Sequence, residues 1–506
     1  MISKKTEYCQ NPILSIFKYY KNNPKKICII FNNKKISYKY LLESIIEFSK
    51  KLENLKKGEK VLIITNDPFK HVVAIYSCFY KSLIPMPYLA ENENNLNHIV
   101  KQTNCKLVIS DQRIKVKNKK LLLTVNELKI SKTQIPEPKI SIKSIFLDKI
   151  AMIYFTSGTT SGVNKGVLQT FNNLEFTKNH ILKKTKINNK IIEIICTPIF
   201  NSFWFGRLNS ILSVGGTLVF YKGSFNPIIF FNLVNKFKIN AISGDTAIYL
   251  FLLKYFKKNL IKISKKILWI KIASQPMLLE KRKELMKIFP KTNIVLGYGL
   301  TEAMRTTLLS FFEEKKYINS DGRPCKEISI KILNNKNKEL RKNKIGNVFI
   351  RGNHVAKGYL NKNKLWKNRF YKGYYKSGDL GILSTSGYLY LKGRADDAIN
   401  ISGQTISLNE VDERLKKLIK RTNFISIGID DPLKVTHKKL VICIESKWKE
   451  KASWHNIRIK LLKINNKSFV PDEVYIARKI PKTNNGKIKY AEVRDNILKK
   501  KYERII

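Results

Sequence analysis

Short apolar runs alternate with amphipathic segments along the first three hundred residues of the chain. Residues 60–65 and 106–110 are apolar runs between polar flanks, which predicts buried strands. Residues 69–81 carry apolar side chains at helical spacing, and residues 94–102 predict a more polar helix. Because strands and helices alternate, the strands are expected to pair in parallel through right-handed crossovers.

The same alternation continues beyond residue 190 and predicts a large α/β body. Strands are predicted at 191–196, 217–221, 239–243, 268–273 and 293–296, and helices at 202–213, 227–237, 246–256 and 279–289. In such sheets ligands bind beyond the carboxyl ends of the strands. Functional residues are therefore expected in the loops that follow the strands.

The pattern changes after residue 300 to short strands and turns. Strands are predicted at 328–333, 346–350, 357–360, 375–381, 424–429 and 439–445, with a hairpin-like segment at 393–413 that runs into a helix. This texture predicts a β-rich subdomain followed by a smaller piece of about a hundred residues, the usual scale of a domain.

Composition limits the class of protein. The 506 residues predict two or three domains, and the 43% of hydrophobic residues supply an ordinary core. Lysines and an aspartate interrupt the most apolar region, residues 228–256, so it does not resemble a membrane span, and the N-terminus lacks an apolar signal core. Seven scattered cysteines predict reduced thiols in a cytoplasmic protein, with neither a disulfide framework nor a zinc site.

The formal net charge of +58 raises the hypothesis of nucleic-acid binding. The lysines, however, occur from end to end and are mixed with Asn and Ile, without a basic arm or an aromatic platform. This distribution favours compositional drift in an A+T-rich genome over selected polyanion binding, so no nucleic-acid partner is expected.

The segment 154–167 is the densest cluster of hydroxyls and glycines, directly behind an apolar run. Its glycines let backbone N–H groups approach an anion, and Lys165 adds a mobile positive charge. The hydroxyls come from Thr156, Ser157, Thr159, Thr160 and Ser161, with Gly158 between them. The spacing fails the standard P-loop pattern, so the alternatives are another polyphosphate-gripping loop or a flexible surface loop.

A second candidate motif is Gly-Tyr-Gly-Leu-Thr-Glu-Ala at 297–303. Tyr298 can stack on a base, and Glu302 beside phosphates is best explained by a magnesium ion between them. The alternative is a strand-to-helix turn in which Thr301 and Glu302 are capping residues. Asp379, between two glycines, is either an acceptor for ribose hydroxyls or an ordinary turn aspartate.

With Pro-Lys-Thr-Asn-Asn-Gly-Lys at 481–487, five motifs stand in a fixed order, and together the chain resembles the acyl-adenylate-forming (AMP-binding) superfamily. This superfamily includes acyl-CoA synthetases, adenylation domains and luciferases. The resemblance runs from about residue 11 to the C-terminal lysine motif and implies a large N-terminal AMP-binding domain, residues 1–395. A small, mobile α+β lid, residues 396–506, is implied to follow it.

The resemblance also implies a role for each matching residue. It assigns the phosphate grip to Thr156–Gly166, the adenine contact to Tyr298, the α-phosphate contact to Thr301 and the magnesium ligand to Glu302. It assigns the ribose to Asp379, ribose and phosphate support to Arg394, the hinge to Asp396 and the adenylation lysine to Lys487. The implied chemistry consumes ATP with Mg²⁺: a carboxylate attacks the α-phosphorus, and after rotation of the lid a thiol such as that of CoA takes the acyl group.

The chain departs from the superfamily pattern at several positions. Ser161 is an extra loop residue, Asn164 replaces the usual proline, and Phe171 stands where many relatives carry histidine. Gln404 follows Gly403 where many CoA ligases have a second glycine, which leaves the thiol tunnel less well defined.

Residues 198–206 match the start of the acyl pocket in the resemblance. Asn201 and Ser202 stand where relatives that activate amino acids carry an aspartate, so an α-amino acid is disfavoured, since its ammonium would be buried unpaired. Phe203 and its aromatic neighbours favour an apolar acid, fatty or aryl, unless they belong to the core. The acyl and CoA pocket is assigned to Asn201, Phe203, Gly299 and Gly403.

The leading interpretation is an ATP-dependent acid–CoA ligase with at most peripheral membrane contact. One alternative is a stand-alone ligase that loads the phosphopantetheine thiol of a carrier protein. Another, of a different class, is a non-catalytic basic polyanion-binding protein on the same fold.

Overall fold

The computed structural model describes residues 11–505 except 90–92, 113, 116–121, 126–147, 157–164, 224, 274–275, 396–397, 402–403, 409–410, 413–414, 417–422, 431–437, 446–458, 460–469 and 483–487. The described chain divides into two compact units. The first unit holds the described residues up to 156, with 165–329 and 350–375, and the second holds 330–349 and those from 376 onward. The predicted domain boundary between residues 395 and 396 stays a prediction.

An eight-stranded sheet is the largest element of the first unit, in the order β14-β13-β12-β11-β9-β10-β1-β2. All neighbours from β13 to β1 pair in parallel, whereas β14 and β2 close the two edges in antiparallel pairing. The strands are β1 (Ile27–Phe31), β2 (Lys34–Ser37), β9 (Ile192–Ile195), β10 (Thr217–Phe220), β11 (Ala241–Asp245), β12 (Trp269–Ala273), β13 (Asn293–Tyr298) and β14 (Thr307–Ser310). The predicted parallel pairing is confirmed.

Two smaller sheets complete the strands of this unit. The first is wholly parallel in the order β4-β3-β5-β6, with β3 (Lys60–Ile64), β4 (Ile84–Pro87), β5 (Leu107–Ser110) and β6 (Leu122–Thr124). The second is an antiparallel hairpin of β7 (Ile150–Thr156) and β8 (Lys165–Thr170), extended by β17 (Gly358–Tyr359). A short pair, β18 (Phe370–Tyr371) with the start of β19 (Tyr374–Leu383), ends the unit.

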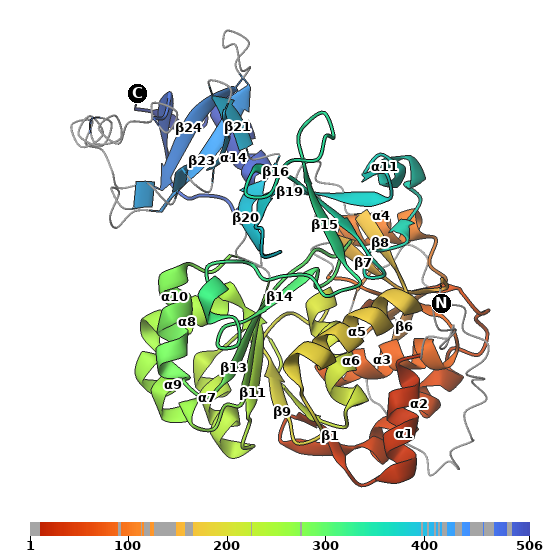
Figure 1. The fold of residues 1–506 in the computed structure, drawn as a ribbon. Coiled ribbons are helices and arrows are strands. Elements are labelled where there is room, and N and C mark those ends of the chain that lie inside the picture. Colours follow the sequence, from red (N-terminus) through yellow and green to blue (C-terminus); the bar gives the residue numbers. More distant parts are fainter. Residues whose placement is uncertain are drawn as a thin grey trace, which may run out of the picture. The chain divides into compact units, whose positions relative to one another are not determined.

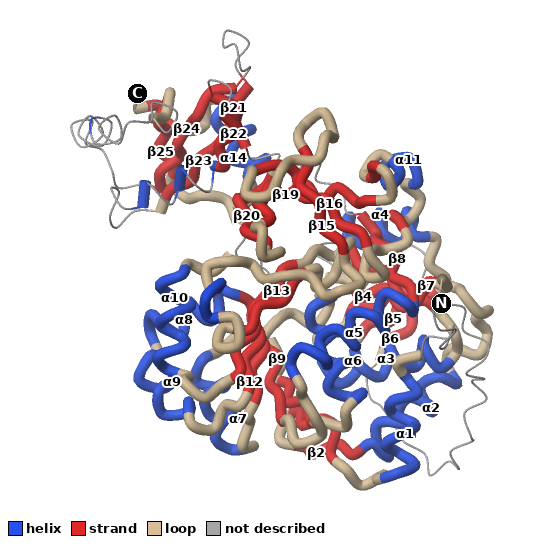
Figure 2. The backbone as a smooth tube through the Cα atoms, viewed as in Figure 1, coloured by secondary structure: helices blue, strands red, loops and turns tan. Residues whose placement is uncertain are grey.

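Helices cover both faces of the large sheet. Figure 1 shows α7 to α10 on one side and α5 and α6 on the other, and Figure 2 shows the strands running between these helical layers. The helices of this unit are α1 (Ile13–Asn22), α2 (Tyr38–Lys50), α3 (Pro68–Tyr80), α4 (Glu93–Thr103), α5 (Phe171–Thr185), α6 (Ser202–Ser213), α7 (Pro227–Lys236), α8 (Thr246–Tyr255), α9 (Lys257–Ser264), α10 (Leu279–Ile288) and α11 (Asn363–Lys367). One large apolar core includes side chains of α1, α2, α3, α5 and α6 together with strands of both parallel sheets.

Local capping explains where several of these helices begin. Asp67 accepts hydrogen bonds from the first turn of α3, and Thr170 and Asn173 form a capping box at the start of α5. Asp245 accepts the N–H of Ile248 at 3.0 Å and so caps α8, which accounts for an acidic residue inside the most apolar stretch of the chain.

The second unit is rich in strands, as the sequence predicts. It contains most of β15 (Ser329–Leu333), β16 (Ile345–Arg351) and β19, with β20 (Leu389–Arg394) paired to β19. A hairpin of β21 (Ala398–Ile401) and β22 (Gln404–Ser407) follows, and then a four-stranded sheet of β23 (Phe424–Asp430), β24 (Lys438–Glu445), β25 (Glu473–Ala477) and β26 (Glu503–Arg504). Helix α14 (Tyr490–Leu498) packs with this sheet through Val493 and Ile497.

The predicted α/β fold class, with a β-rich part after residue 300, is confirmed. Within the described residues, no helix combines the length and apolar character needed to cross a membrane.

Candidate active site

The hydroxyl-rich loop is attached to a rigid hairpin in the first unit. Thr156 ends β7 and Lys165 begins β8, and the two residues are direct partners across the antiparallel pair. The structure therefore fixes both ends of the candidate phosphate loop. Ser157, Gly158, Thr159 and Thr160 lie outside the described residues, and their assignment to ATP stays a prediction.

The backbone around Glu302 is held by polar contacts from two neighbouring segments. The side-chain amide of Gln169 on β8 donates to the carbonyl of Thr301 at 2.6 Å. The N–H of Ala356 donates to the carbonyl of Glu302 at 2.8 Å, and Ala303 forms a β-bridge with Val355. The segment is thus anchored to the same hairpin that carries Lys165.

The side chain of Glu302 is oriented by a tyrosine that the sequence analysis did not single out. The hydroxyl of Tyr359 on β17 donates to Glu302 Oε1 at 2.7 Å and lies 3.2 Å from the hydroxyl of Tyr375. Trp366 packs its ring edge-on against Tyr359 at 4.9 Å between centroids and stacks on Tyr375. Burial and the adjacent carboxylate of Glu302 raise the pKa of Tyr359, so the phenol stays protonated as a donor.

Lys165 joins this group from the other side. Its Nζ atom lies 5.7 Å from the centroid of the Tyr359 ring, within the range of a cation–π contact. The structure therefore brings Lys165 together with Glu302 and the backbone of Thr301, although more than a hundred residues separate Lys165 from the other two. A cation that directly follows the hydroxyl-rich segment in the sequence, close to an anchored carboxylate, suits a polyphosphate bound with a metal ion.

Tyr298 and Gly299 lie at the end of β13. Tyr298 is half-buried and pairs with Thr307 on β14, while Gly299 is exposed. A Cβ atom on Gly299 would overlap the backbone nitrogen of Arg305 and lie 3.0 Å from the carbonyl oxygen of Ala303. Gly299 is therefore required for the chain to fold back on itself immediately after the motif.

Asp379 and Arg394 form a pair of their own in the second unit. They are cross-strand partners on β19 and β20, and Arg394 Nη1 donates to Asp379 Oδ1 at 3.0 Å. The same nitrogen donates to the carbonyl of Ser377, whose hydroxyl accepts the N–H of Asp379. Gly378 has φ +82°, and a Cβ atom there would meet the Arg394 guanidinium at 2.7 Å. The predicted ribose residues thus form one ordered unit.

Besides the four residues of the phosphate loop, three more predicted residues fall outside the described part of the chain: Lys487, Asp396 and Gly403. Their roles as adenylation lysine, hinge and pocket residue stay predictions.

The predicted acyl pocket begins at α6. Asn201 stands at the helix N-cap without a side-chain capping bond, and the carbonyl of Phe203 accepts a long 3.5 Å bond from Arg305. Trp204 is 1% exposed and packs on Phe220 and His71, so that aromatic belongs to the core. A cavity does adjoin α6, and its lining from this helix is Ser202, Phe205, Gly206 and Asn209.

The residues present fit a magnesium ion that arrives with a nucleotide. The carboxylate of Glu302 is the hard oxygen ligand that Mg²⁺ prefers, and its anchoring phenol is neutral, which leaves the negative charge available. Across the described ranges no group of three or more His, Cys, Asp or Glu side chains could hold a metal unaided. Phosphate oxygens would have to supply the remaining ligands.

Parallel strands with helices on both faces, a hydroxyl-rich loop and an anchored carboxylate define a nucleotide-binding enzyme. The chain belongs to the AMP-binding enzyme family, whose sequence profile matches residues 16–360. The superfamily resemblance seen in the sequence is thereby confirmed.

Curated relatives match most of the chain. A 2-succinylbenzoate–CoA ligase of Bacillus velezensis is 25% identical over 462 residues, which is 89% of this chain and 92% of that protein. An oxalate–CoA ligase of Saccharomyces cerevisiae is 29% identical over 357 residues, 69% of this chain and 64% of that protein.

Solved structures share the fold. The o-succinylbenzoate CoA synthetase of Bacillus subtilis, in complex with its acyl-adenylate intermediate, superposes with a TM-score of 0.81 at 20% identity, covering 95% of this chain and 98% of that one. ATP-bound MatB of Rhodopseudomonas palustris gives 0.83 at 18% identity, covering 96% and 98%.

Proposed function

We propose that this protein is an AMP-forming acid–CoA ligase. It would join a carboxylic acid to ATP as an acyl-adenylate with release of pyrophosphate, and then transfer the acyl group to the thiol of CoA. The observation that carries the proposal is the anchored Glu302: its backbone is held by Gln169 and Ala356, and its carboxylate is oriented by Tyr359. A carboxylate fixed in this way beside Lys165 has no evident structural purpose, whereas a metal–polyphosphate site requires it.

In the first half-reaction, a carboxylate oxygen of the acid attacks the α-phosphorus of ATP. An O–P bond forms between the carboxylate and the α-phosphorus, the bond between the α-phosphorus and its bridging oxygen to the β-phosphate breaks, and pyrophosphate leaves. Lys165 would bind the outgoing phosphates and Lys487 would stabilise the charge that builds on the α-phosphate oxygens. Glu302 would hold the magnesium ion, which neutralises phosphate charge when bound.

In the second half-reaction, the CoA sulfur attacks the acyl carbon. A C–S bond forms, the bond from that carbon to the AMP oxygen breaks, AMP leaves, and the thiol proton passes to solvent. Asp379 and Arg394 would hold the ribose of the nucleotide through both steps, in keeping with their fixed pairing.

The relatives named for succinylbenzoate and oxalate favour a small aryl or dicarboxylic acid over a long-chain fatty acid. The alternative of a non-catalytic polyanion-binding protein is disfavoured despite the high lysine content. Such a protein would have no reason to keep the motifs that membership in an enzyme family explains.

The test is acid-dependent ATP–pyrophosphate exchange across short, medium, long-chain, aryl and amino acids, with Lys487→Ala and Lys489→Ala in parallel. Lys489 forms an exposed ion pair with Glu492, which makes Lys489→Ala the matched control. Exchange with one class of acid, reduced on the order of 100-fold in Lys487→Ala alone, is the expected result.

The acceptor is tested by adding CoA, and separately a phosphopantetheinylated carrier protein, to the preformed adenylate. Release of AMP with CoA alone is expected, whereas release with the carrier alone would replace CoA as the acceptor. Absence of exchange with every acid would contradict the proposed ligase activity. Binding to nucleic acid with a steep salt dependence would then favour the polyanion-binding alternative.

A further inference from the structure

A small cavity in the first unit lies between α5, α6 and the segment just after Glu302. The free space inside it is about 10 Å³, and its lining includes Tyr154, Lys178, Phe205, Gly206, Asn209 and Arg305. No acidic side chain is among the residues that line it. That is room for about one small polar group, and a long acyl chain does not fit.

Arg305 is the unusual residue of this cavity. It is 8% exposed and has φ +57°, a left-handed conformation that stores strain in a residue with a Cβ atom. Its guanidinium lies directly against Gly206, where a Cβ atom would overlap Nη2 and lie 2.6 Å from Cζ. Gly206 therefore makes the space on α6 that lets this arginine reach the cavity wall.

The hydrogen bonds of Arg305 are incomplete. Nη2 makes one long bond of 3.5 Å to the carbonyl of Phe203, and Nε is buried without a partner among the described residues. The hydroxyl of Tyr154, which lines the same cavity and is 2% exposed, also has no partner there. Burial raises the pKa of Tyr154 well above its usual value, so this hydroxyl is a donor. The cavity thus presents two buried donors without acceptors.

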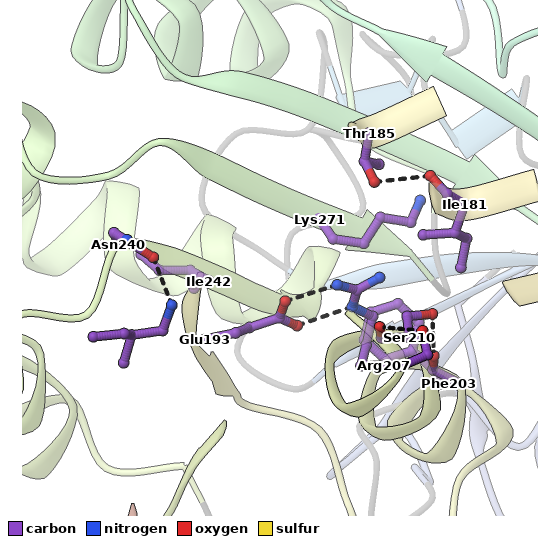
Figure 3. A network of polar contacts seen from close by, with 12 residues as sticks. Ile181, Thr185, Glu193, Phe203, Arg207, Ser210, Asn240, Ile242 and Lys271 are labelled. Atoms are coloured by element: carbon purple, nitrogen blue, oxygen red, sulfur yellow. Dashed lines mark hydrogen bonds and ion pairs between the residues drawn. The ribbon is translucent and has the colours of Figure 1, made fainter. Parts of the chain in front are cut away.

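Two of the neighbouring cations are paired with carboxylates, whereas Lys271 donates only to backbone carbonyls and Arg305 has no ion pair in the described part of the chain. Arg207 forms two bonds with Glu193, 2.9 Å from Nε and 2.7 Å from Nη2, as Figure 3 shows. Lys178 pairs with Glu175 at 2.7 Å. For Arg305, no carboxylate within the described part of the chain forms an ion pair, and its strongest charged neighbour is another cation, Arg207. Burial lowers the pKa of Arg305 to about 9, which leaves the guanidinium charged at neutral pH.

The chemistry of a fitting ligand follows from these contacts. An ammonium group is excluded because cations line the wall, and a purely apolar group would leave the two donors buried and unsatisfied. A carboxylate accepts from a guanidinium and a phenol at once and supplies the missing negative charge. Arg305 stands three residues after Glu302, so the cavity belongs with the candidate active site.

We infer that Arg305, assisted by Tyr154, binds a second, non-reacting anionic group of the acid substrate, so that the preferred substrates are small dicarboxylic acids. This inference rests on the proposed function, and it names Arg305 as the residue that determines specificity for the proposed reaction.

The experiment compares matched acids that differ only in the second charge: succinate against butyrate and succinamate, and isophthalate against benzoate. Acid-dependent pyrophosphate release is expected to give a kcat/KM on the order of 100-fold higher for the diacid in each set, because a site built for a charged hydrogen-bond partner rejects the analogue that lacks it. In Arg305→Met the kcat/KM for the diacid is expected to fall to that of the monoacid. The kcat/KM for the monoacid and the KM for ATP are expected to stay unchanged. Tyr154→Phe is expected to weaken the preference for the diacid about tenfold.

Arg282→Met is the matched control, since Arg282 is also a buried arginine of the first unit. It is held by Asp321 and by the carbonyls of Met277 and Ile318, and it does not line the cavity. Its loss is expected to lower thermal stability without changing the preference between diacid and monoacid.

A second readout does not depend on turnover. Succinate is expected to raise the melting temperature of the wild-type protein, and butyrate is not, with the succinate effect absent in Arg305→Met. Equal kcat/KM for diacids and monoacids in the wild type, or an unchanged preference in Arg305→Met, overturns the inference. Absence of turnover with every acid overturns the proposed function. In that case, a succinate-dependent rise in melting temperature that is lost in Arg305→Met still supports the anion site. Absence of that rise overturns the anion site as well. Should Arg305→Met not fold, the wild-type comparison and Tyr154→Phe decide.

Discussion

Two buried arginines of the first unit, Arg207 and Arg305, differ in whether the protein supplies a carboxylate to neutralise them. Around Arg207, the chain supplies its own anion: Glu193 is completely buried, accepts two hydrogen bonds and neutralises the guanidinium, which also stacks on the Trp269 ring at 4.3 Å. Around Arg305, whose guanidinium lies against Gly206 of the same helix, the described chain supplies no carboxylate that pairs with it. The Arg207 pair is therefore complete within the protein, whereas the proposed partner of Arg305 is the substrate's second anionic group.

Removing the carboxylate from the complete region is expected to have the largest effect. In Glu193→Gln the Arg207 guanidinium stays buried without its counter-charge, and the free energy of unfolding is expected to fall by about 3–5 kcal/mol. Urea denaturation measures it. In the control Glu284→Gln, which removes an ion pair with the half-exposed Lys257 and Lys281, the loss is expected to stay below about 1 kcal/mol. Equal losses in the two variants would contradict the distinction between a buried and a surface pair.

The sequence located the two regions only in part. The alternation of apolar runs predicted α6 at its observed bounds, residues 202–213, because an amphipathic helix carries its signal in its own spacing. Nothing in that spacing distinguishes Arg207, which pairs with a strand residue, from any solvent-facing arginine. Their difference arises from contacts with residues far away in the chain, and a single sequence does not contain them.

The candidate site was predictable to the extent that its motifs are local. Lys165 and Glu302 were found because each stands in a short glycine-rich motif. Tyr359, which orients Glu302 from more than fifty residues away, has only a two-residue strand around it and no local signal. The assignment of Phe203 to the acyl pocket stays a prediction; the cavity beside α6 is lined by Phe205 and Gly206, since a helix presents only one face to it.

A third buried base shows another way to avoid an unpaired charge, which is to lose the proton. His354 is completely buried, and burial lowers its pKa to about 3, so it is neutral at pH 7. In the unfolded chain this histidine has an ordinary pKa near 6.5, so below that pH it binds a proton that it does not bind in the folded protein. The titration of His354 therefore leaves the free energy of unfolding unchanged above about pH 6.5 and lowers it as the pH falls from there toward 3.

At pH 5 this histidine alone is expected to lower the free energy of unfolding by about 2 kcal/mol relative to pH 7. Denaturation at the two pH values should show that loss reduced by the same amount in His354→Gln. The exposed His98 provides the control, and His98→Gln should leave the pH dependence as in the wild type. A wild-type pH dependence in His354→Gln would mean that other groups carry the acid sensitivity.

The smallest expected effect concerns a carboxylate anchored without being neutralised. Glu193 faces a cation, whereas Glu302 faces the neutral phenol of Tyr359 at 2.7 Å, which fixes its direction but leaves its charge for a metal ion. In Tyr359→Phe the carboxylate keeps its charge and loses its orientation. The magnesium concentration for half-maximal pyrophosphate release is therefore expected to rise about tenfold, the lower end of the range for residues that support a metal ligand.

Tyr249→Phe separates this effect from the loss of any buried phenol. The hydroxyl of Tyr249 donates to the carbonyls of Ile242 and Lys271, away from Glu302, so its removal should lower stability and leave the magnesium dependence unchanged. A magnesium dependence that shifts in both variants, or in neither, would mean that Tyr359 supports the fold and not the metal ligand. A shift in Tyr359→Phe alone would mean that the partners of the two carboxylates determine their roles. Glu193 neutralises a buried arginine of the fold, and Glu302 keeps its charge for the magnesium ion of the nucleotide.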